Sequence, residues 1–450
     1  MPYSVPQNID PDKIFLVNFS ELEGRWDPTF TIYNKNINHY AFPIVRLQDL
    51  IAKNPQYGTA ESGIPRISEL APRYIRITDI DELGNLDDGL GATAENIEMQ
   101  YILNENDILF ARSGATVGKA YLHRKQPYVC FFAGYMIRFV VDNTKILPQY
   151  LFIYTQLKPY KDWVKAIQRA AAQPNINAEE YKSLPTSLPP LHIQQQIVDV
   201  YNAALSLRKK KLSVSKAKLA SIDQYLLDEL GITLPQKDNS LEKRIFTVNF
   251  SKVSGRRLDP FWQTVQHEKM TSNKFQEFTV KSLAMLQKGT SITSDEIIEG
   301  DYPVIAGGQT SPYSHNEYNF EGNVITISAS GAYSGYVWYH DKHIFASDCT
   351  VLQSIDENKC LTKYLYEILR LKQQELYNLQ QGAGQPHVYP QDIAKILIPL
   401  PPLEKQREIA NNISAIRAEA KRLEQEGEEI LQSARLQVEQ IILGEKDIEG

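Results

Sequence analysis

The sequence predicts a mixed α/β protein in which two tandem globular domains of similar fold are joined by two long antiparallel coiled-coil helices, with a pseudo-two-fold internal repeat. The segment Leu188–Leu191, which reads Leu-Pro-Pro-Leu, returns as Leu400–Leu403. Each copy opens a charged run in which leucine, isoleucine or valine recurs every seven residues, as in paired helices. The blocks before the two runs differ in sequence, so we interpret the helices as a constant frame and the blocks as its variable part.

The beginning of the chain is repeated as well. Phe15–Ser20 and Gly24–Pro28 match Phe246–Ser251 and Gly255–Pro260. Since the period is far longer than a solenoid repeat of 20 to 50 residues, a domain and its helix were duplicated together. The predicted organisation is a first domain at 1–186, a first helix at 187–231, a linker at 232–245, a second domain at 246–398, a second helix at 399–444 and a tail at 445–450.

Inside the two blocks, strand and helix patterns follow in the same order. Alternating apolar residues predict strands at Asp107–Arg112 and Tyr135–Val141 in the first block, and at Asn323–Ser328 and Gly335–Tyr339 in the second. Gly114, Gly118 and Asp142-Asn143 indicate turns. Helices are predicted at Leu151–Leu157 and Tyr160–Ala172, and at Leu361–Tyr377. Both blocks are therefore expected to share one mixed fold.

The long helices carry the clearest periodicity. Proline at their entrances suits a first helical turn, and Gly231 and Gly444 suit their ends. Because about forty residues span roughly 60 Å, one small domain cannot cover such a helix. We expect the two helices to pair with each other, antiparallel; the alternative is two separate hairpins, each folded onto its own domain. The predicted pairing residues are Val198, Leu205, Leu212, Leu219, Leu226, Ile409, Ile416, Leu423 and Ile430.

Composition gives no sign of a chain coated in positive charge. The 450 residues are 42% hydrophobic and 23% charged, with a formal net charge of -6, so any surface that binds nucleic acid must be local. Cys130, Cys349 and Cys360 form no Cys-x-x-Cys pair, which favours a reducing compartment. No signal peptide or membrane span is predicted, and the expected location is the cytoplasm.

Catalytic motifs were sought without success. The segment Ser113–Ala120 resembles a phosphate loop, but its glycines are one residue too close and Ala120 replaces the magnesium-binding hydroxyl. Asn54–Tyr57 lacks the second proline of the Asn-Pro-Pro-Tyr loop of amino-methyltransferases. His340 and His343 have no acidic or cysteine cluster beside them that would complete a metal site. The chain is predicted to bind rather than to catalyse.

Polar residues in matched loops are the candidates for contact with DNA, because side-chain amides and guanidinium groups read base edges and lysines hold phosphates. Lys209–Lys211 on the first helix could also meet phosphates, although such a run is usually a solvated face. The acidic residues Glu424, Glu426, Glu428 and Glu429 indicate that the second helix faces protein. The candidate DNA-binding residues are Arg112, Ser113, Gly114, Thr116, Gly118, Lys119, Gln173, Asn175, Gln309, Thr310, Tyr313, Ser330, Gly331, Tyr333, Ser334, Gln385 and His387.

Two motifs at the helix entrances carry a resemblance to a known family. They read Pro-Pro-Leu-x-x-Gln and end at Gln194 and Gln406, with Ile197 and Ile409 following. With the glycine loop Ser113–Lys119, they make almost the whole chain resemble the specificity subunit of type I restriction-modification systems. The second glycine loop departs from this pattern, since Tyr336 stands where the first has lysine.

The resemblance implies a function for each part. Each domain would read one half of a bipartite, asymmetric target in double-stranded DNA, and the helices would set the spacer and dock two methyltransferase subunits. The chain itself would be non-catalytic and bind no cofactor or metal; partner subunits would bring AdoMet, and restriction subunits, where present, ATP and Mg²⁺. The alternative is a structural assembly protein with two ligand-binding domains on a helical strut. A self-contained methyltransferase is least favoured, because no AdoMet-binding motif is found.

Overall fold

A computed structural model describes residues 16, 30–33, 40–168, 174–234, 247, 270–382 and 384–446. The repeated openings Phe15–Pro28 and Phe246–Pro260, apart from Leu16 and Thr247, lie outside the described residues, as do most of the predicted linker and the last four residues of the tail. The chain forms two compact units. Unit 1 consists of residues 1–211 and 425–450, and unit 2 of residues 212–424, so each long helix contributes one half to each unit.

Unit 1 is built on a four-stranded antiparallel sheet with the order β2-β9-β6-β7. A smaller sheet, β3-β5-β4-β8, contains one parallel pair, β4 with β8. Strands β1 and β10 pair separately. The strands are β1 Ile44–Arg46, β2 Gln56–Tyr57, β3 Ile64–Pro65, β4 Arg73–Ile75, β5 Ala92–Thr93, β6 Ile108–Ala111, β7 Ala120–Leu122, β8 Cys130–Phe132, β9 Met136–Phe139 and β10 Pro185–Ser187; the helices are α2 Pro148–Tyr154, α3 Lys158–Ile167 and α4 Ala178–Lys182.

Unit 2 repeats this plan. Its four-stranded sheet has the order β14-β20-β17-β18, a three-stranded sheet has the order β16-β15-β19, and β13 pairs with β21 and β11 with β12. The strands are β11 Ile232–Thr233, β12 Thr271–Ser272, β13 Glu277–Thr279, β14 Ala284–Lys288, β15 Tyr302–Ile305, β16 Ser314–His315, β17 Val324–Ser328, β18 Val337–His340, β19 Phe345–Ala346, β20 Cys349–Ser354 and β21 Leu397–Pro399; the helices are α9 Val280–Leu283, α10 Thr362–Leu371, α11 Gln373–Tyr377 and α12 Pro390–Ile393.

The two units match strand for strand in their central sheets. Strands β6 and β9 pair antiparallel in unit 1, as β17 and β20 do in unit 2, and a hairpin strand, β7 or β18, flanks each. Each smaller sheet keeps one parallel pair, β4 with β8 and β15 with β19. The predicted internal repeat of one mixed fold is therefore confirmed.

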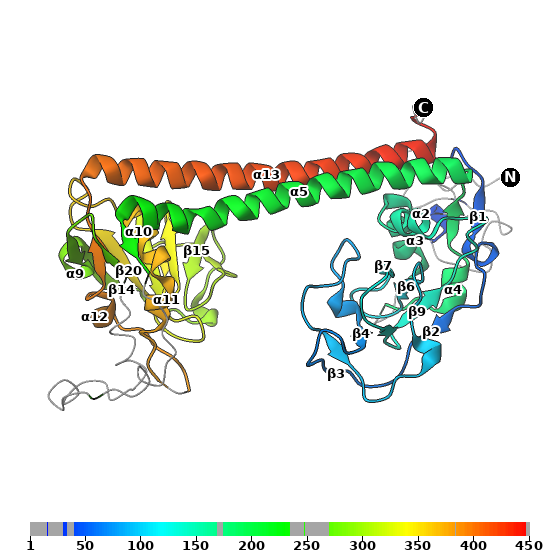
Figure 1. Ribbon diagram of the computed structural model, residues 1–450, viewed down its shortest axis with the longest axis horizontal. Helices are drawn as coiled ribbons and strands as arrows, with labels where there is room; N and C mark the ends of the chain where they lie inside the picture. Colours follow the sequence, from blue (N-terminus) through cyan, green and yellow to red (C-terminus); the bar gives the residue numbers. More distant parts are fainter. Residues whose placement is uncertain are drawn as a thin grey trace. The chain divides into compact units, whose positions relative to one another are not determined.

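Within each unit, short helices lie between the main sheet and the long helices (Figure 1). In unit 1 a single buried cluster joins Phe110 and Phe139 of the sheet to Tyr150 and Trp163 of α2 and α3, and continues to Val438 of the long helix α13 (Leu403–Leu443). Burying aromatic side chains contributes most per residue to such a core. Unit 2 has an equivalent cluster around Tyr364 and Ile368 of α10. Each sheet is thus fixed to the helical frame through its own core.

The short helix predicted at Leu361–Tyr377 differs from expectation in one place. Instead of running unbroken from Leu361 to Tyr377, it stops at Leu371 and restarts at Gln373. Lys372 between them has φ -87° and ψ 20°, outside the helical region. Its side chain is almost completely buried, where the ammonium donates to the carbonyl of Met270 at 3.1 Å and pairs with Glu375 at 3.1 Å. These buried contacts compensate the interruption, and periodicity alone does not reveal them.

The long helices α5 (Leu191–Leu230) and α13 (Leu403–Leu443) both begin directly after a Pro-Pro pair and end at a glycine with positive φ. Gly231 has φ 60° and Gly444 has φ 75°, a conformation that glycine adopts without steric cost at a helix C-terminus. The helix boundaries follow from these two residue types.

The helices run antiparallel in both units. In unit 1, Arg208 pairs with Glu428 at 2.5 Å and Lys211 with Glu426 at 2.6 Å, so positions rise along α5 as they fall along α13. In unit 2, Lys405 pairs with Glu229 at 2.6 Å, and the Asn412 amide donates to the Tyr225 hydroxyl at 2.9 Å. This pairing agrees with the predicted fold class and argues against two separate hairpins.

The contact between the helices is apolar toward the ends of α5 and polar near its middle. Val198, Leu226, Ile409 and Leu423 are buried as the heptad pattern predicts, and Leu205, Leu212, Ile416 and Ile430 are partly buried. Leu219 is 39% exposed. On α5, the position three residues after each predicted one is also buried or partly buried. These residues include Tyr201 and Ile222 toward the ends of α5 but Arg208 and Ser215 nearer its middle, and Ser215 donates to Glu424 at 2.8 Å. A heptad count of leucines does not detect this polar stretch.

Other expectations concern small features. No helix among the described residues is long and apolar enough to cross a membrane. Cys130, Cys349 and Cys360 are buried free thiols, and burial raises their pKa to about 11 for Cys130 and about 12 for the other two. Gln56 and Tyr57 of the Asn-Pro-Gln-Tyr segment form strand β2.

Candidate nucleic-acid interface

The candidate residues of unit 1 come together where the turn after β6 meets the segment before α4. We call residues 112–119 and 174–176 the unit 1 loop pair. The N–H of Gly114 donates to the carbonyl of Pro174 at 3.1 Å, and the N–H of Ile176 donates to the carbonyl of Arg112 at 2.8 Å. These hydrogen bonds set Asn175 opposite Ser113. Two segments about sixty positions apart in the sequence therefore present their polar side chains together.

Unit 2 builds the same arrangement. Its loop pair consists of residues 329–336 and 386–388. The N–H of Gly331 donates to the carbonyl of Pro386 at 3.0 Å, and the N–H of Val388 donates to the carbonyl of Ala329 at 2.9 Å. His387 thereby stands opposite Ser330, as Asn175 stands opposite Ser113. The sequence predicted matched loops, and the backbone hydrogen bonds of the two pairs correspond one to one.

The glycines make this turn possible. Gly114 and Gly331 have φ 82° and 84°, and nothing lies within 4 Å of the place where a side chain would begin. Gly118 and Gly335 have φ 86° and 95°, but a Cβ at Gly118 would lie 2.7 Å from Val164 and one at Gly335 would lie 2.9 Å from the carbonyl of Leu376. The first glycine of each loop faces open space, and the second packs against a helix.

Burial separates the remaining candidates. Asn175, Gln309, Thr310 and Gln385 are exposed, and Tyr333 is 47% exposed. Ser334, in contrast, is fully buried, and its hydroxyl has no hydrogen-bond partner in the described structure. It lies at the position of Val117 in unit 1, which is why it points inward, and in this conformation it is a packing residue rather than a contact residue. Gln173 lies outside the described residues.

A further loop joins the unit 2 loop pair. Gly307 packs so closely on it that a Cβ there would lie 2.5 Å from the carbonyl oxygen of Ser330. The residues that follow, Gln309 and Thr310, are exposed, and Tyr313 is 55% exposed. The sequence prediction that this loop adds to the unit 2 site agrees with that packing.

Three residues beside the loop pairs were not predicted. The Arg112 guanidinium lies 5.0 Å from the ring centroid of Tyr57, and the N–H of Arg112 donates to the carbonyl of Tyr135, whose side chain is 58% exposed. In unit 2, the residue matching Tyr135 in this contact is Asp348, whose carboxylate accepts a hydrogen bond from the Ser330 hydroxyl. Each comes from a strand or strand end distant in the sequence, so only the pairing of β2 and β6 with β9, and of β17 with β20, could have indicated them.

The two loop pairs thus share a backbone and differ in chemistry. Unit 1 presents Arg112, Tyr57 and Tyr135, a guanidinium among aromatic rings. Unit 2 presents Asp348 with Ser330, and the His387 ring stacked on Tyr389 with centroids 6.2 Å apart. Arginine pairs with guanine and a carboxylate accepts from the cytosine amino group, so such surfaces would select different bases.

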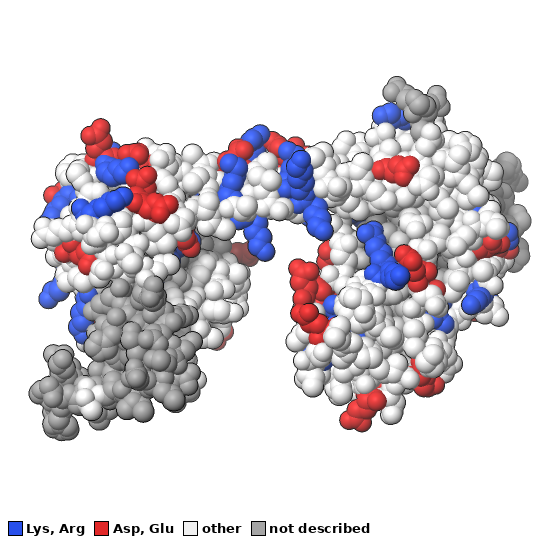
Figure 2. Space-filling view, in the orientation of Figure 1, with Lys and Arg blue, Asp and Glu red and all other residues white. Residues whose placement is uncertain are grey.

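The glycine turn of unit 1 carries a lysine that the turn of unit 2 lacks. Lys119 pairs with Glu82 at 3.0 Å, whereas its counterpart in unit 2 is Tyr336. On α5, Lys211 is engaged by Glu426, and Lys209 and Lys210 are exposed. Figure 2 shows blue Lys and Arg side chains on the long helices and on the part of unit 1 next to them.

The histidine pair at the end of β18 has an ordinary structural environment. His340 shares a 2.8 Å hydrogen bond with the Thr326 hydroxyl, and burial lowers its pKa to about 4. His343 lies edge-on to Tyr318, with ring centroids 4.3 Å apart. Across the described ranges, no group of three or more His, Cys, Asp and Glu side chains is placed to hold a metal ion.

Comparison with known proteins places this architecture in a family. The model of the type I restriction modification DNA specificity domain matches residues 90–214 and 272–432, more than half of the chain. The chain therefore belongs to the type I restriction-modification DNA specificity family. Both matched segments contain a loop-pair turn and part of a long helix.

Individual relatives carry the same description. The protein named "Putative type I specificity subunit S.MpnORF285P" of Mycoplasma pneumoniae is 28% identical over 147 residues, which are 31% of this chain and 47% of that protein. The type I restriction enzyme MjaVIII specificity subunit of Methanocaldococcus jannaschii is 22% identical over 374 residues, 74% of this chain and 77% of that protein. The chain thus spans about half of the first relative's length and three quarters of the second's.

A solved structure has the same fold. A chain from a study of complex assembly and conformational transition of the type I R-M system superposes with a TM-score of 0.53 at 15% identity, covering 90% of this chain and 98% of that one. This likeness concerns the fold.

Proposed function

We propose that this chain is the DNA-recognition subunit of a type I restriction-modification complex, in which each unit reads one half of a bipartite, asymmetric target. The observation that carries the proposal is the duplicated loop pair. One backbone arrangement occurs twice, with Asn175 opposite Ser113 and His387 opposite Ser330, but with different side chains around it. A repeated frame with unlike contact residues is what a reader of two different half-sites requires.

The long helices supply the other part of the proposal. They hold the two units in one chain, set the spacer between the half-sites and offer docking surfaces to two methyltransferase subunits. Specificity subunits of this family are not catalysts, so AdoMet and ATP with Mg²⁺ would be bound by partner subunits. Where restriction subunits are present, they would join the same complex. The work of the chain would take place in the cytoplasm.

The test is to co-express the chain with its methyltransferase and map N6-methyladenine across a genome. One bipartite motif with a fixed spacer is expected. Methylation of an undivided motif would contradict the proposal, and so would DNA binding without sequence preference, which the alternative of a structural assembly protein predicts.

A domain exchange tests which unit recognises which half-site. Strands β1 and β10 pair so that Ile44 lies opposite Ser187 and Val45 opposite Thr186, which brings the two ends of the exchanged segment together. Replacing Val45–Thr186 with the matching segment of another specificity subunit should change one half-site and keep the other. If both half-sites changed, the units would not read independently.

A further inference from the structure

Beside the unit 1 loop pair lies a cleft of about 570 Å³ whose walls come from three parts of unit 1. One wall is the glycine turn from Ala115 to Ala120, the second is the side of α3, and the third is the paired segment of α5 and α13. The turn that presents Arg112 and Ser113 on one side therefore lines the cleft with its other end.

The cleft contains more cations than anions. Lys119, Lys161, Lys165, Arg208 and Arg435 line it, against Glu82 and Glu428. Glu82 pairs with Lys119 and Glu428 pairs with Arg208, and these carboxylates are mostly exposed, at 92% and 60%. Among the described residues, the side chains of the other three cations form no ion pair or hydrogen bond.

The three unpaired cations disfavour one another. Burial lowers the pKa of Lys161, and the charge of Arg435 lowers it further. The Nε of Arg435 is buried without a hydrogen-bond partner. Glu439, the next acidic residue along α13, accepts the N–H of Lys158 at 2.6 Å, and its charge and that of Glu82 partly offset the lowering of the Lys161 pKa. A cluster of this kind becomes favourable when an anion with several acceptor oxygens occupies it.

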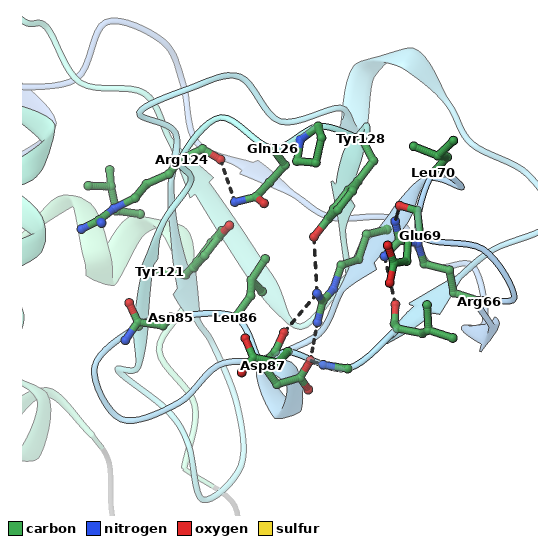
Figure 3. A pocket seen from close by; sticks show the side chains of 17 residues that line it. Arg66, Glu69, Leu70, Asn85, Leu86, Asp87, Tyr121, Arg124, Gln126 and Tyr128 are labelled. Carbon is green, nitrogen blue, oxygen red and sulfur yellow. Dashed lines mark hydrogen bonds and ion pairs between the residues drawn. The ribbon is translucent and has the colours of Figure 1, made fainter. Parts of the chain in front are cut away.

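Another cleft of unit 1 contains two arginines that have charged or carbonyl partners (Figure 3), although the Nε of Arg73 is also buried without a hydrogen-bond partner. In this cleft of about 490 Å³, Arg73 pairs with Asp87 at 2.5 Å and Arg66 donates to backbone carbonyls, including that of Ala71 at 2.8 Å. The Arg66 guanidinium also lies 4.1 Å from the ring centroid of Tyr128. Arg66 and Arg73 thus have protein partners, as Arg208 has in the other cleft, whereas Lys161, Lys165 and Arg435 have none among the described residues.

Unit 2 has acidic residues at two of the three positions that match by counting along the sequence. Lys161 lies 14 residues after Leu147, and the residue 14 after its counterpart Leu361 is Glu375, which pairs with Lys372. Arg435 lies 32 residues into α13, and the residue 32 into α5 is Asp223, which pairs with Arg370 at 2.5 Å. The unpaired positive charge is therefore a property of unit 1 and does not follow from the shared fold.

We propose that the cleft binds backbone phosphates of the DNA duplex beside the half-site read by unit 1, through Lys161, Lys165 and Arg435. The inference rests on the proposed function, because a duplex whose bases face the loop pair brings its sugar-phosphate chain to the turn that lines the cleft. Phosphate contacts fix position without reading sequence. Unit 1 is then anchored by charge, and unit 2 relies on base and aromatic contacts.

The experiment measures duplex binding by the full chain in complex with its methyltransferase, over a range of salt concentrations. The triple variant Lys161→Gln, Lys165→Gln, Arg435→Gln should lower the slope of log K against log salt by about 0.9 per lost contact. Its affinity for cognate and unrelated duplexes should fall by the same factor, while the methylated motif stays unchanged. Lys125→Gln, which removes an exposed charge from unit 1 outside the cleft, is the matched control and should leave the slope unchanged.

Two further variants act in the opposite direction. Glu82→Gln and Glu428→Gln release Lys119 and Arg208, and each should strengthen binding about two- to tenfold at low salt. Because the triple variant removes repulsion, its resistance to urea should be retained; a loss of stability would instead indicate a structural role.

The possible outcomes separate the two proposals. If the wild-type complex methylates a bipartite motif but the triple variant has the same salt dependence of duplex binding, the cleft does not bind phosphates and the proposed function stands. If the triple variant methylated a different motif, the proposal of phosphate binding would also be wrong, because the change would show that these residues recognise bases. If the wild-type complex binds every duplex alike and methylates none, the proposed function itself fails.

Discussion

Gln194 and Gln406 make the same three hydrogen bonds, each in its own unit. The side-chain oxygen accepts the N–H of Leu147 or Leu361, at 2.8 and 2.9 Å, and the side-chain nitrogen donates to the carbonyls of Lys145 and Pro189, or of Lys359 and Pro401. Both side chains are fully buried. Each glutamine ties the entrance of a long helix to the first turn of the short helix beneath it.

We therefore expect Gln194→Ala and Gln406→Ala each to lower the free energy of unfolding by about 2–4 kcal/mol, since each leaves buried backbone groups without partners. Urea unfolding measures the change. Gln195→Ala, at an exposed neighbouring position, should cost no more than about 0.5 kcal/mol. Equal effects at positions 194 and 195 would contradict the role given to the buried amide.

The glycine turns allow a matched comparison. Gly118→Ala and Gly335→Ala should destabilise their units more than Gly114→Ala and Gly331→Ala, because all four have positive φ but only the first two collide with a neighbouring helix. We expect about 1 kcal/mol for the open positions and at least about 2 kcal/mol for the crowded ones. Thermal unfolding of the four variants provides the ranking, and a reversed order would show that the crowded turns relax.

The chemistry around the loop pairs predicts separate effects on the two half-sites. Asp348→Asn should change the bases accepted in one half-site only, because the amide adds donors where the carboxylate only accepts. Arg112→Lys should relax the other half-site, since lysine lacks the planar fork of arginine. Sequencing of methylated positions detects both changes. If the methylated motif were unaltered in either variant, the substituted residue would not recognise bases.

Deletion of matched heptads tests the helices as a spacer. Removing Leu205–Lys211 alone takes away Arg208 and Lys211 and leaves Glu428 and Glu426 without partners. Removing Gln425–Leu431 as well deletes both sides of the contact. We expect the single deletion to impair assembly and the double deletion to shorten the spacer by about three base pairs, given ~1.5 Å per helical residue and ~3.4 Å per base pair. If the double-deletion variant still methylated DNA and kept the original spacer, the proposal that the long helices set the spacer length would be wrong.

Two buried histidines predict a loss of stability in mild acid. Burial lowers the pKa of His123 and of His340 to about 4, against about 6.5 in an unfolded chain. Between these values the unfolded state binds protons that the folded state does not, so stability is complete above pH 6.5 and falls as the pH drops toward 4. The difference between pH 7.5 and pH 5 should be about 2 kcal/mol for each histidine.

Urea unfolding at the two pH values measures this difference, with His123→Gln and His340→Gln as comparisons. Each variant should lose less stability on acidification than the wild type, whatever its stability at pH 7.5. A pH dependence identical to that of the wild type would mean that the histidines do not carry it.

Much of the fold follows from repetition and periodicity. The two Pro-Pro entrances, the glycine exits and the seven-residue spacing predicted both long helices and their pairing, because each helix shows an apolar face that only a long partner covers. The antiparallel direction was expected because each helix leaves the same end of its own domain. The break at Lys372 was not predictable, since it depends on a buried contact with Met270, 102 positions away.

The candidate site was predictable only where the repeat marks it. Matching loops indicated Ser113 and Ser330 as one set and Asn175 and His387 as another, and the structure brings the two sets together. Tyr135 and Asp348 escaped notice because they reach the loops through strand pairing, and Ser334 was included because its burial depends on the packing of the turn. Lys161 and Arg435 belong to different helices, and only the folded chain brings their charges together.

The polar middle of the long helices has a consequence for how they align. Apolar side chains repeated every seven residues fit almost as well after a slide of one heptad, because each would meet another of its kind. Arg208 opposite Glu428 and Lys211 opposite Glu426 do not tolerate that slide, since it separates each charge from its partner. The ion pairs thus favour one alignment of the two helices among several that would bury similar amounts of apolar surface. Helices that set the spacer between two half-sites need such a single alignment, because each alternative would give another spacer length.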